Sequence, residues 1–140
     1  MATSSPLRGL STLNVFAADH EAAREWYAEF LGVEPYFERP GYVEFRLGNY
    51  QHELGIIDSK YVPDGQGNDG RAGGLVYWHV DDLEATFQRL LSMGAKEHDG
   101  PRDRGAKGFR TASVIDPFGN LLGIMYNPHY LEMLASLEPA

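Results

Sequence analysis

The sequence predicts a single α+β domain built from two copies of a β-α-β-β-β module. The chain has 140 residues, which is the length of one domain. Two stretches with helical apolar spacing are each preceded by one strand-like stretch and followed by about three more. The second helical stretch, 81–94, repeats the first, 19–32, at an offset of 62 residues. This order indicates an internal repeat of one structural unit.

Composition and charge restrict the class of protein. Apolar residues make up 43% of the chain and charged residues 23%, as in ordinary globular proteins, and no apolar run approaches the roughly 18 residues of a membrane-spanning helix. The net charge of −8 argues against nucleic acid and anionic membranes as partners. The absence of cysteine excludes disulfides, thiolate metal sites and a cysteine nucleophile. The first residues lack a secretion signal, so we expect a cytoplasmic location.

The first module is predicted from a change in the spacing of its apolar residues, from a strand-like stretch to a helical one. Residues 10–17 are rich in strand formers and too short for a helix, so they predict a strand. Asp19 is a suitable N-cap for the helix that follows, and Gly32 is a suitable end. Gly48 and Asn49 form a hairpin signal between two of the three strands expected next, which are 34–38, 42–47 and 50–57.

The second module follows the same order. Residues 74–80 predict a strand, and helical spacing then continues to Gly94. Asp81 and Glu84 have the spacing of a capping box, which places the helix start at Asp81. Residues up to 104 are weakly defined, and the last two strands are expected at 109–115 and 121–126.

These predictions divide the chain into five segments. The stretch before the second module is rich in Gly, Asp and Pro and has no apolar periodicity, so we interpret it as a connector between modules, with a lid as the alternative. The final segment begins with Asn-Pro and is predicted to be helical. The boundaries are a tail at 1–9, modules at 10–58 and 74–126, the connector at 59–73, and a C-terminal helical tail at 127–140.

Several short motifs follow one another along the two modules: VFAAD at 15–19, WY at 26–27, FLG at 30–32, VDDL at 80–83, GA at 94–95 and DPFGN at 116–120. In this order and spacing they resemble the vicinal oxygen chelate superfamily, which comprises the glyoxalase, bleomycin resistance and extradiol dioxygenase group. The similarity runs from about Leu10 to Tyr126. It implies paired βαβββ modules whose sheets curl around a cavity, commonly completed in a homodimer.

Metal-using members of this group bind a divalent ion through His, Glu or Gln at four matching positions. Here three of those positions carry Thr12, Leu75 and Gly123, and only the fourth carries a ligand type, Glu53, or His52 if the strand register differs by one residue. Leucine and glycine have no side-chain donor. The resemblance therefore implies the fold without the chelate, and we expect no metal and no cofactor.

Strand alternation predicts which side chains line the cavity. If the helices cover one sheet face, alternate residues of the first and last strands of each module lie on the other. Each of them also has a structural interpretation, such as a hydrogen-bonded core histidine for His79. The candidate binding residues are Thr12, Asn14, Phe16, Glu53, Leu75, Tyr77, His79, Gly123 and Met125, with Gly55 and Leu121 beside them.

Three functions are compatible with these residues. The favoured one is a metal-free homodimer that binds a small molecule and sequesters an aromatic or cationic organic compound. The second is an isomerase or lyase in which Glu53, assisted by His79, is the catalytic base because an apolar pocket raises its pKa. The third is a metal-dependent enzyme of the glyoxalase or dioxygenase kind, with His52, Glu53 and His79 as ligands.

Overall fold

The computed structural model describes residues 10–61 and 75–137. The chain divides into two compact units, residues 1–68 and 69–140. The predicted tail at 1–9 and all but the first three residues of the predicted connector at 59–73 lie outside the described residues, so the linker and lid interpretations both stay predictions.

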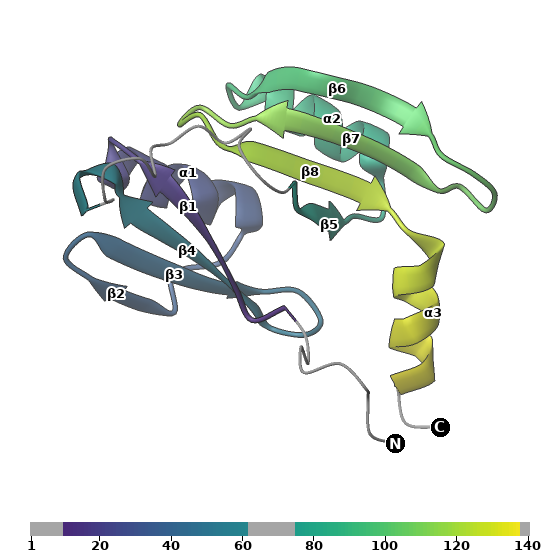
Figure 1. The fold of residues 1–140 in the computed structure, drawn as a ribbon, viewed down its shortest axis with the longest axis horizontal. Coiled ribbons are helices and arrows are strands. Elements are labelled where there is room, and N and C mark those ends of the chain that lie inside the picture. Colours follow the sequence, from purple (N-terminus) through teal and green to yellow (C-terminus); the bar gives the residue numbers. More distant parts are fainter. Residues whose placement is uncertain (1–9, 62–74, 138–140) are drawn as a thin grey trace. The chain divides into compact units, whose positions relative to one another are not determined.

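The described part of unit 1, residues 10–61, contains one α-helix and a four-stranded sheet (Figure 1). The sheet order is β1-β4-β3-β2, with β1 parallel to β4 and the other neighbours antiparallel. Asp19 caps the helix by accepting a hydrogen bond from the Ala22 N–H, and Gly32 ends it in the left-handed conformation. The elements are β1 (Thr12–Ala17), α1 (His20–Leu31), β2 (Phe37–Arg39), β3 (Tyr42–Leu47) and β4 (His52–Asp58), followed by a 3-10 turn at Ser59–Tyr61.

Unit 2 repeats this topology and adds a helix at its end. Its sheet order is β5-β8-β7-β6, with β5 parallel to β8. The α+β class and the paired βαβββ modules are therefore confirmed. The elements are β5 (Tyr77–His79), α2 (Leu83–Ser92), β6 (Lys96–Asp103), β7 (Arg110–Ile115), β8 (Leu121–Tyr126) and α3 (Pro128–Leu137).

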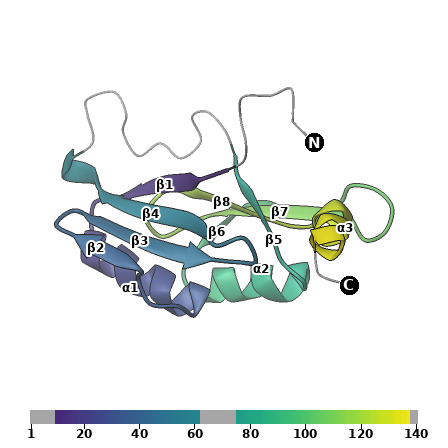
Figure 2. The ribbon, with the colours of Figure 1, turned by 90° about the horizontal axis from the view of Figure 1, so that it is seen from below.

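In each unit one helix covers one face of the sheet. Figure 2 shows α1 lying along the β1-β4-β3-β2 sheet. Tyr27 of α1 is buried, as are Val43, Phe45 and Ile56, which alternate along β3 and β4 toward the helix. In unit 2 the buried face of α2 consists of Leu83, Phe87 and Leu90. No helix in the described ranges 10–61 and 75–137 is long and apolar enough to span a membrane.

Two sequence predictions in unit 2 were wrong. The N-cap of α2 is Asp82 rather than Asp81, because the Asp82 side chain accepts the hydrogen bond from the Ala85 N–H. Residues before Arg104, expected to be weakly defined, form the eight-residue strand β6. This strand lacks apolar alternation and pairs with β7 through register shifts, so its sequence carries no period-2 signal.

Two strands of unit 1 also have different ends from those predicted. Strand 42–47 is confirmed, whereas the strand expected at 34–38 occupies Phe37–Arg39. The strand expected from residue 50 begins at His52. The reason is the turn: Gly48 and Gln51 both have positive φ, and the Gln51 N–H donates to the Gly48 carbonyl.

Candidate functional site

The sheet of unit 1 has a second face, which points away from α1. Alternation places Thr12, Asn14 and Phe16 of β1 on this face, since Val15 and Ala17 between and after them are buried. We call it the non-helical face of unit 1. Within residues 10–61 no α-helix covers it. Its other members come from β3 and β4 and are Tyr42, Glu44, Arg46, Glu53 and Gly55.

Glu53 is held by two donors on this face. Thr12 lies directly opposite it on β1, and the Thr12 hydroxyl donates to Glu53 Oε1 at 2.6 Å. Arg46 lies opposite it on β3, with Nη2 3.6 Å from Glu53 Oε2. The side chains of Arg46 and Glu53 are 38% and 29% exposed. Glu53 therefore presents a partly exposed carboxylate between a hydroxyl donor and a guanidinium group.

A second polar group lies beside it, over Gly55. A Cβ at Gly55 would meet Asn14 Oδ1 and would lie 2.8 Å from the Tyr42 hydroxyl. The Tyr42 hydroxyl donates to Glu44 Oε1 at 2.6 Å. Gly55 thus provides the space in which an amide and a phenol approach each other. Burial, together with the hydrogen bond to the Glu44 carboxylate, raises the pKa of Tyr42 to about 12.

The raised pKa of Tyr42 gives a testable titration. Because the folded-state value lies above the ordinary 10.0, the stabilisation by the neutral phenol is complete below about pH 10 and is lost as pH rises through about 12. We expect the tyrosinate absorbance of the folded protein to show a late phase near pH 12 that Tyr42→Phe removes. The control Tyr61→Phe should leave that phase in place. A late phase that persists in Tyr42→Phe would contradict the assignment.

In unit 2 the candidate positions form a less polar surface. Tyr77 lies opposite Gly123, and a Cβ at Gly123 would lie 2.8 Å from Tyr77 Cδ1, so the tyrosine ring covers the glycine. Met125 and His79 form the next pair along the same strands. Leu75 precedes β5 and supplies no polar group.

His79 has a structural role in this unit. Its side chain is only 8% exposed. Nδ1 accepts a hydrogen bond from the Asn127 N–H at 3.1 Å, and Nε2 lies 3.2 Å from Asp81 Oδ1, so the network assigns the ring hydrogen to Nε2. The ring stacks on Tyr130 with centroids 4.8 Å apart. His79 thus fixes the start of α3 against β5.

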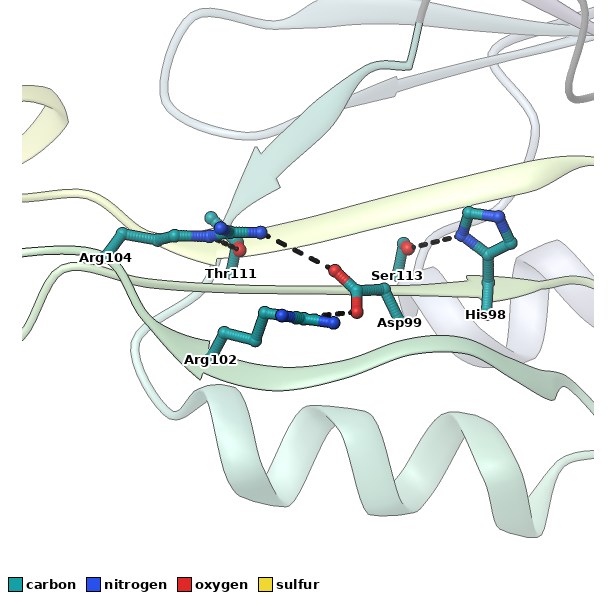
Figure 3. Close-up of polar contacts among 6 residues, drawn as sticks. All are labelled: His98, Asp99, Arg102, Arg104, Thr111 and Ser113. Atoms are coloured by element: carbon teal, nitrogen blue, oxygen red, sulfur yellow. Dashed lines mark hydrogen bonds and ion pairs between the residues drawn. The ribbon is translucent and has the colours of Figure 1, made fainter.

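The sheet of unit 2 also carries a polar cluster that sequence reasoning missed (Figure 3). Ser113 and Thr111 of β7 are buried, and their hydroxyls bond to His98 Nδ1 at 2.9 Å and to Arg104 Nε at 2.8 Å. Asp99 lies 2.8 Å from Arg102 Nε and 3.5 Å from Arg104 Nη2. These contacts flank the register shifts between β6 and β7, so side-chain bonds hold β6 to β7 where the regular backbone pairing is interrupted.

The structure brings only part of the predicted site together. Thr12, Asn14 and Glu53 meet on one face, whereas Glu53 and His79 belong to different units. Sequence reasoning missed the β3 residues Tyr42, Glu44 and Arg46. A signal was present: once Val43 and Phe45 are assigned to the core, the alternate residues of the predicted strand 42–47 must share the face of Glu53.

The residues at the expected metal positions do not fit a divalent ion. The Thr12 hydroxyl is bonded to Glu53, and Leu75 and Gly123 have no donor. His52 and Glu53 are consecutive in β4 and so point to opposite faces, which separates two ligands of the third hypothesis. Over residues 10–61 and 75–137, no three His, Asp or Glu side chains are grouped to hold a metal.

Comparison with known proteins gives a family and a set of similar folds. Residues 9–124 match the family model described as Glyoxalase/Bleomycin resistance protein/Dioxygenase superfamily. No curated protein matches the sequence at a significant level.

Three solved structures illustrate the similarity of fold. A glyoxalase-related enzyme from Fulvimarina pelagi has a TM-score of 0.68 and 20% identity, covering 87% of this chain and 90% of the other. A lactoylglutathione lyase from Agrobacterium tumefaciens has a TM-score of 0.65 and 21% identity, covering 89% and 98%. A bleomycin resistance determinant encoded on the transposon Tn5 has a TM-score of 0.61 and 22% identity, covering 86% and 99%.

Proposed function

Because the chain belongs to the Glyoxalase/Bleomycin resistance protein/Dioxygenase superfamily, we propose that it is a metal-free protein that binds and sequesters a small aromatic or cationic organic molecule. The similar structures include both a lyase and a resistance determinant, so the fold leaves the function open and the site must decide it. The binding surface is the non-helical face of unit 1.

One observation carries this proposal: the partly exposed Glu53 carboxylate lies near aromatic and amide side chains, while the expected metal positions Leu75 and Gly123 have no side-chain donor. Arg46 lies 3.7 Å above the ring of Tyr36, and the ring of Phe37 lies 6.3 Å from that of Tyr42. Tyr36 and Phe37 are 60% and 45% exposed. Exposed rings beside a carboxylate are the chemistry that recognises an organic cation.

The proposal includes a homodimer and excludes two classes of partner. Superfamily resemblance implies that a second copy completes the binding site. The net charge of −8 favours cationic ligands over nucleic acid or anionic lipid. Light scattering on purified protein measures the oligomeric state directly, and a monomer at all concentrations would contradict this part of the proposal.

The proposal is tested by calorimetric titration with two probes, the planar cation thioflavin T and a cationic glycopeptide of the bleomycin kind. We expect saturable binding of at least one probe to the wild type. Glu53→Gln should weaken it by about tenfold or more, because the charge-assisted contact is lost while the shape is kept. Absence of saturable binding by either probe would refute the proposal.

The matched control is Glu38→Gln. It removes one negative charge from the same unit, but Glu38 is engaged by Arg24 of α1 at 2.8 Å, on the helical side of the sheet. We expect its affinity for the probes to match that of the wild type. Equal losses in Glu38→Gln and Glu53→Gln would mean that net charge, rather than this face, governs binding.

A further inference from the structure

The guanidinium of Arg46 occupies a cation site built by its neighbours. Its Cζ lies 3.7 Å from the centroid of the Tyr36 ring, and its Nη2 lies 3.6 Å from Glu53 Oε2. The ring supplies a π face and the carboxylate supplies a negative charge, which together are the partners of a planar cation. The other oxygen of Glu53 is bonded to Thr12, so Oε2 is the one presented to the cation.

Both contacts that hold Arg46 are weak. The separation of 3.6 Å from Glu53 is too long for a hydrogen bond, and both side chains are more than a quarter exposed. Tyr36 is 60% exposed, so solvent reaches the ring that Arg46 covers. An exposed ion pair and an exposed cation–π contact are each worth little, so an external cation has little to displace.

The neighbouring charge favours a cation here once Arg46 has moved away. Glu44 lies two residues before Arg46 on β3 and faces the same side, and its carboxylate is bonded to the Tyr42 hydroxyl, which carries no positive charge. Arg39 lies opposite Tyr42 on β2, so the two carboxylates of Glu44 and Glu53 are balanced by the two guanidinium groups of Arg39 and Arg46. If Arg46 moves away, the two carboxylates exceed Arg39 by one negative charge, and two tyrosine rings remain beside them.

We infer that Arg46 is a tethered occupant of a binding site for a guanidinium or amidinium group, and that a ligand with such a planar cationic head displaces it. The head group stacks on Tyr36 and donates to Glu53 Oε2 the short charge-assisted hydrogen bond that Arg46 does not make. This inference rests on the proposed function and adds the chemical class of the ligand. It also makes Arg46 a competitor of the ligand: its tether keeps the effective concentration of the internal cation high.

The test is an isothermal calorimetric titration of benzamidinium into the wild type and into Arg46→Met. We expect Arg46→Met to bind benzamidinium about fivefold more tightly, because the ligand no longer competes with two weak internal contacts. Arg46→Lys, which keeps the charge but loses the planar fork, should give a smaller gain. Adding Glu53→Gln to Arg46→Met should abolish the gain.

The control is Arg24→Met, which removes one positive charge from the same unit on the helical side and should bind as the wild type does. Equal or weaker benzamidinium binding by folded Arg46→Met overturns the inference. So does benzoate binding that the wild type shows and Arg46→Met loses, since Arg46 would then be a ligand for anions. If thioflavin T or the glycopeptide still binds through Glu53 in those cases, the proposed function survives and only the displacement of Arg46 is refuted.

Discussion

Asp116→Ala is expected to lower the free energy of unfolding by about 4 kcal/mol. Asp116 is 3% exposed, and its Oδ1 accepts hydrogen bonds from the Phe118 N–H at 2.9 Å and the Asn120 N–H at 2.8 Å. Asn120 is itself buried and its side-chain amide lies 3.3 Å from Oδ2. Hydrogen bonds to a charged acceptor contribute roughly 1.5 to 3 kcal/mol each, and alanine would remove this acceptor from both backbone donors.

Urea denaturation measures this loss. Asp116→Asn, which keeps one carbonyl acceptor for the turn, should lose less than Asp116→Ala. Glu132→Ala is the control: it removes a carboxylate from the same unit, but that side chain is 62% exposed and 3.9 Å from Lys107, so we expect a change below about 1 kcal/mol. An Asp116→Ala protein as stable as the Glu132→Ala control would show that the turn is held by other contacts.

The DPFGN turn illustrates what the sequence could predict. It contributed most to the family resemblance, and strand 121–126 after it is confirmed. Turns and amphipathic helices are encoded locally, so the repeat of the two modules could be predicted from one sequence. Adjacent Asp81 and Asp82 both suit an N-cap, and only the orientation of the Asp82 side chain toward Ala85 selects the second.

The candidate site could be predicted in part. Alternation along β1 and β4 placed Thr12 and Glu53 on one face, since the period of a strand is strict. The partners of His79 could not be predicted, because Asn127 and Tyr130 follow β8 and reach β5 only through the parallel pairing of the two strands. Such contacts depend on tertiary structure, which local patterns do not encode.

Gly123→Ala is the second substitution expected to have a large effect, a loss of about 3 kcal/mol in the free energy of unfolding. A Cβ at this position would lie 2.7 Å from the Val76 carbonyl oxygen and 2.8 Å from Tyr77 Cδ1. The carbonyl belongs to the backbone and accepts the Gly123 N–H at 3.2 Å, so it cannot move without disturbing the pairing of β5 with β8. The same urea denaturation measures the loss.

Gly55→Ala is the matched comparison, because Gly55 occupies the same place in unit 1, opposite Asn14 of the parallel strand. The three atoms nearest to its added Cβ all belong to side chains, those of Asn14 and Tyr42, which can rotate aside, so we expect a loss of about 1 kcal/mol or less. The main effect of Gly55→Ala should instead be a change in the contact between Tyr42 and Glu44. Displacement of the Tyr42 hydroxyl from Glu44 removes one cause of its raised pKa, and the late tyrosinate phase near pH 12 should move to lower pH. Equal destabilisation by the two alanine substitutions would mean that the side chains over Gly55 are as rigid as the backbone beside Gly123. The non-helical face of unit 1 would then be a packed surface that does not adapt to a ligand.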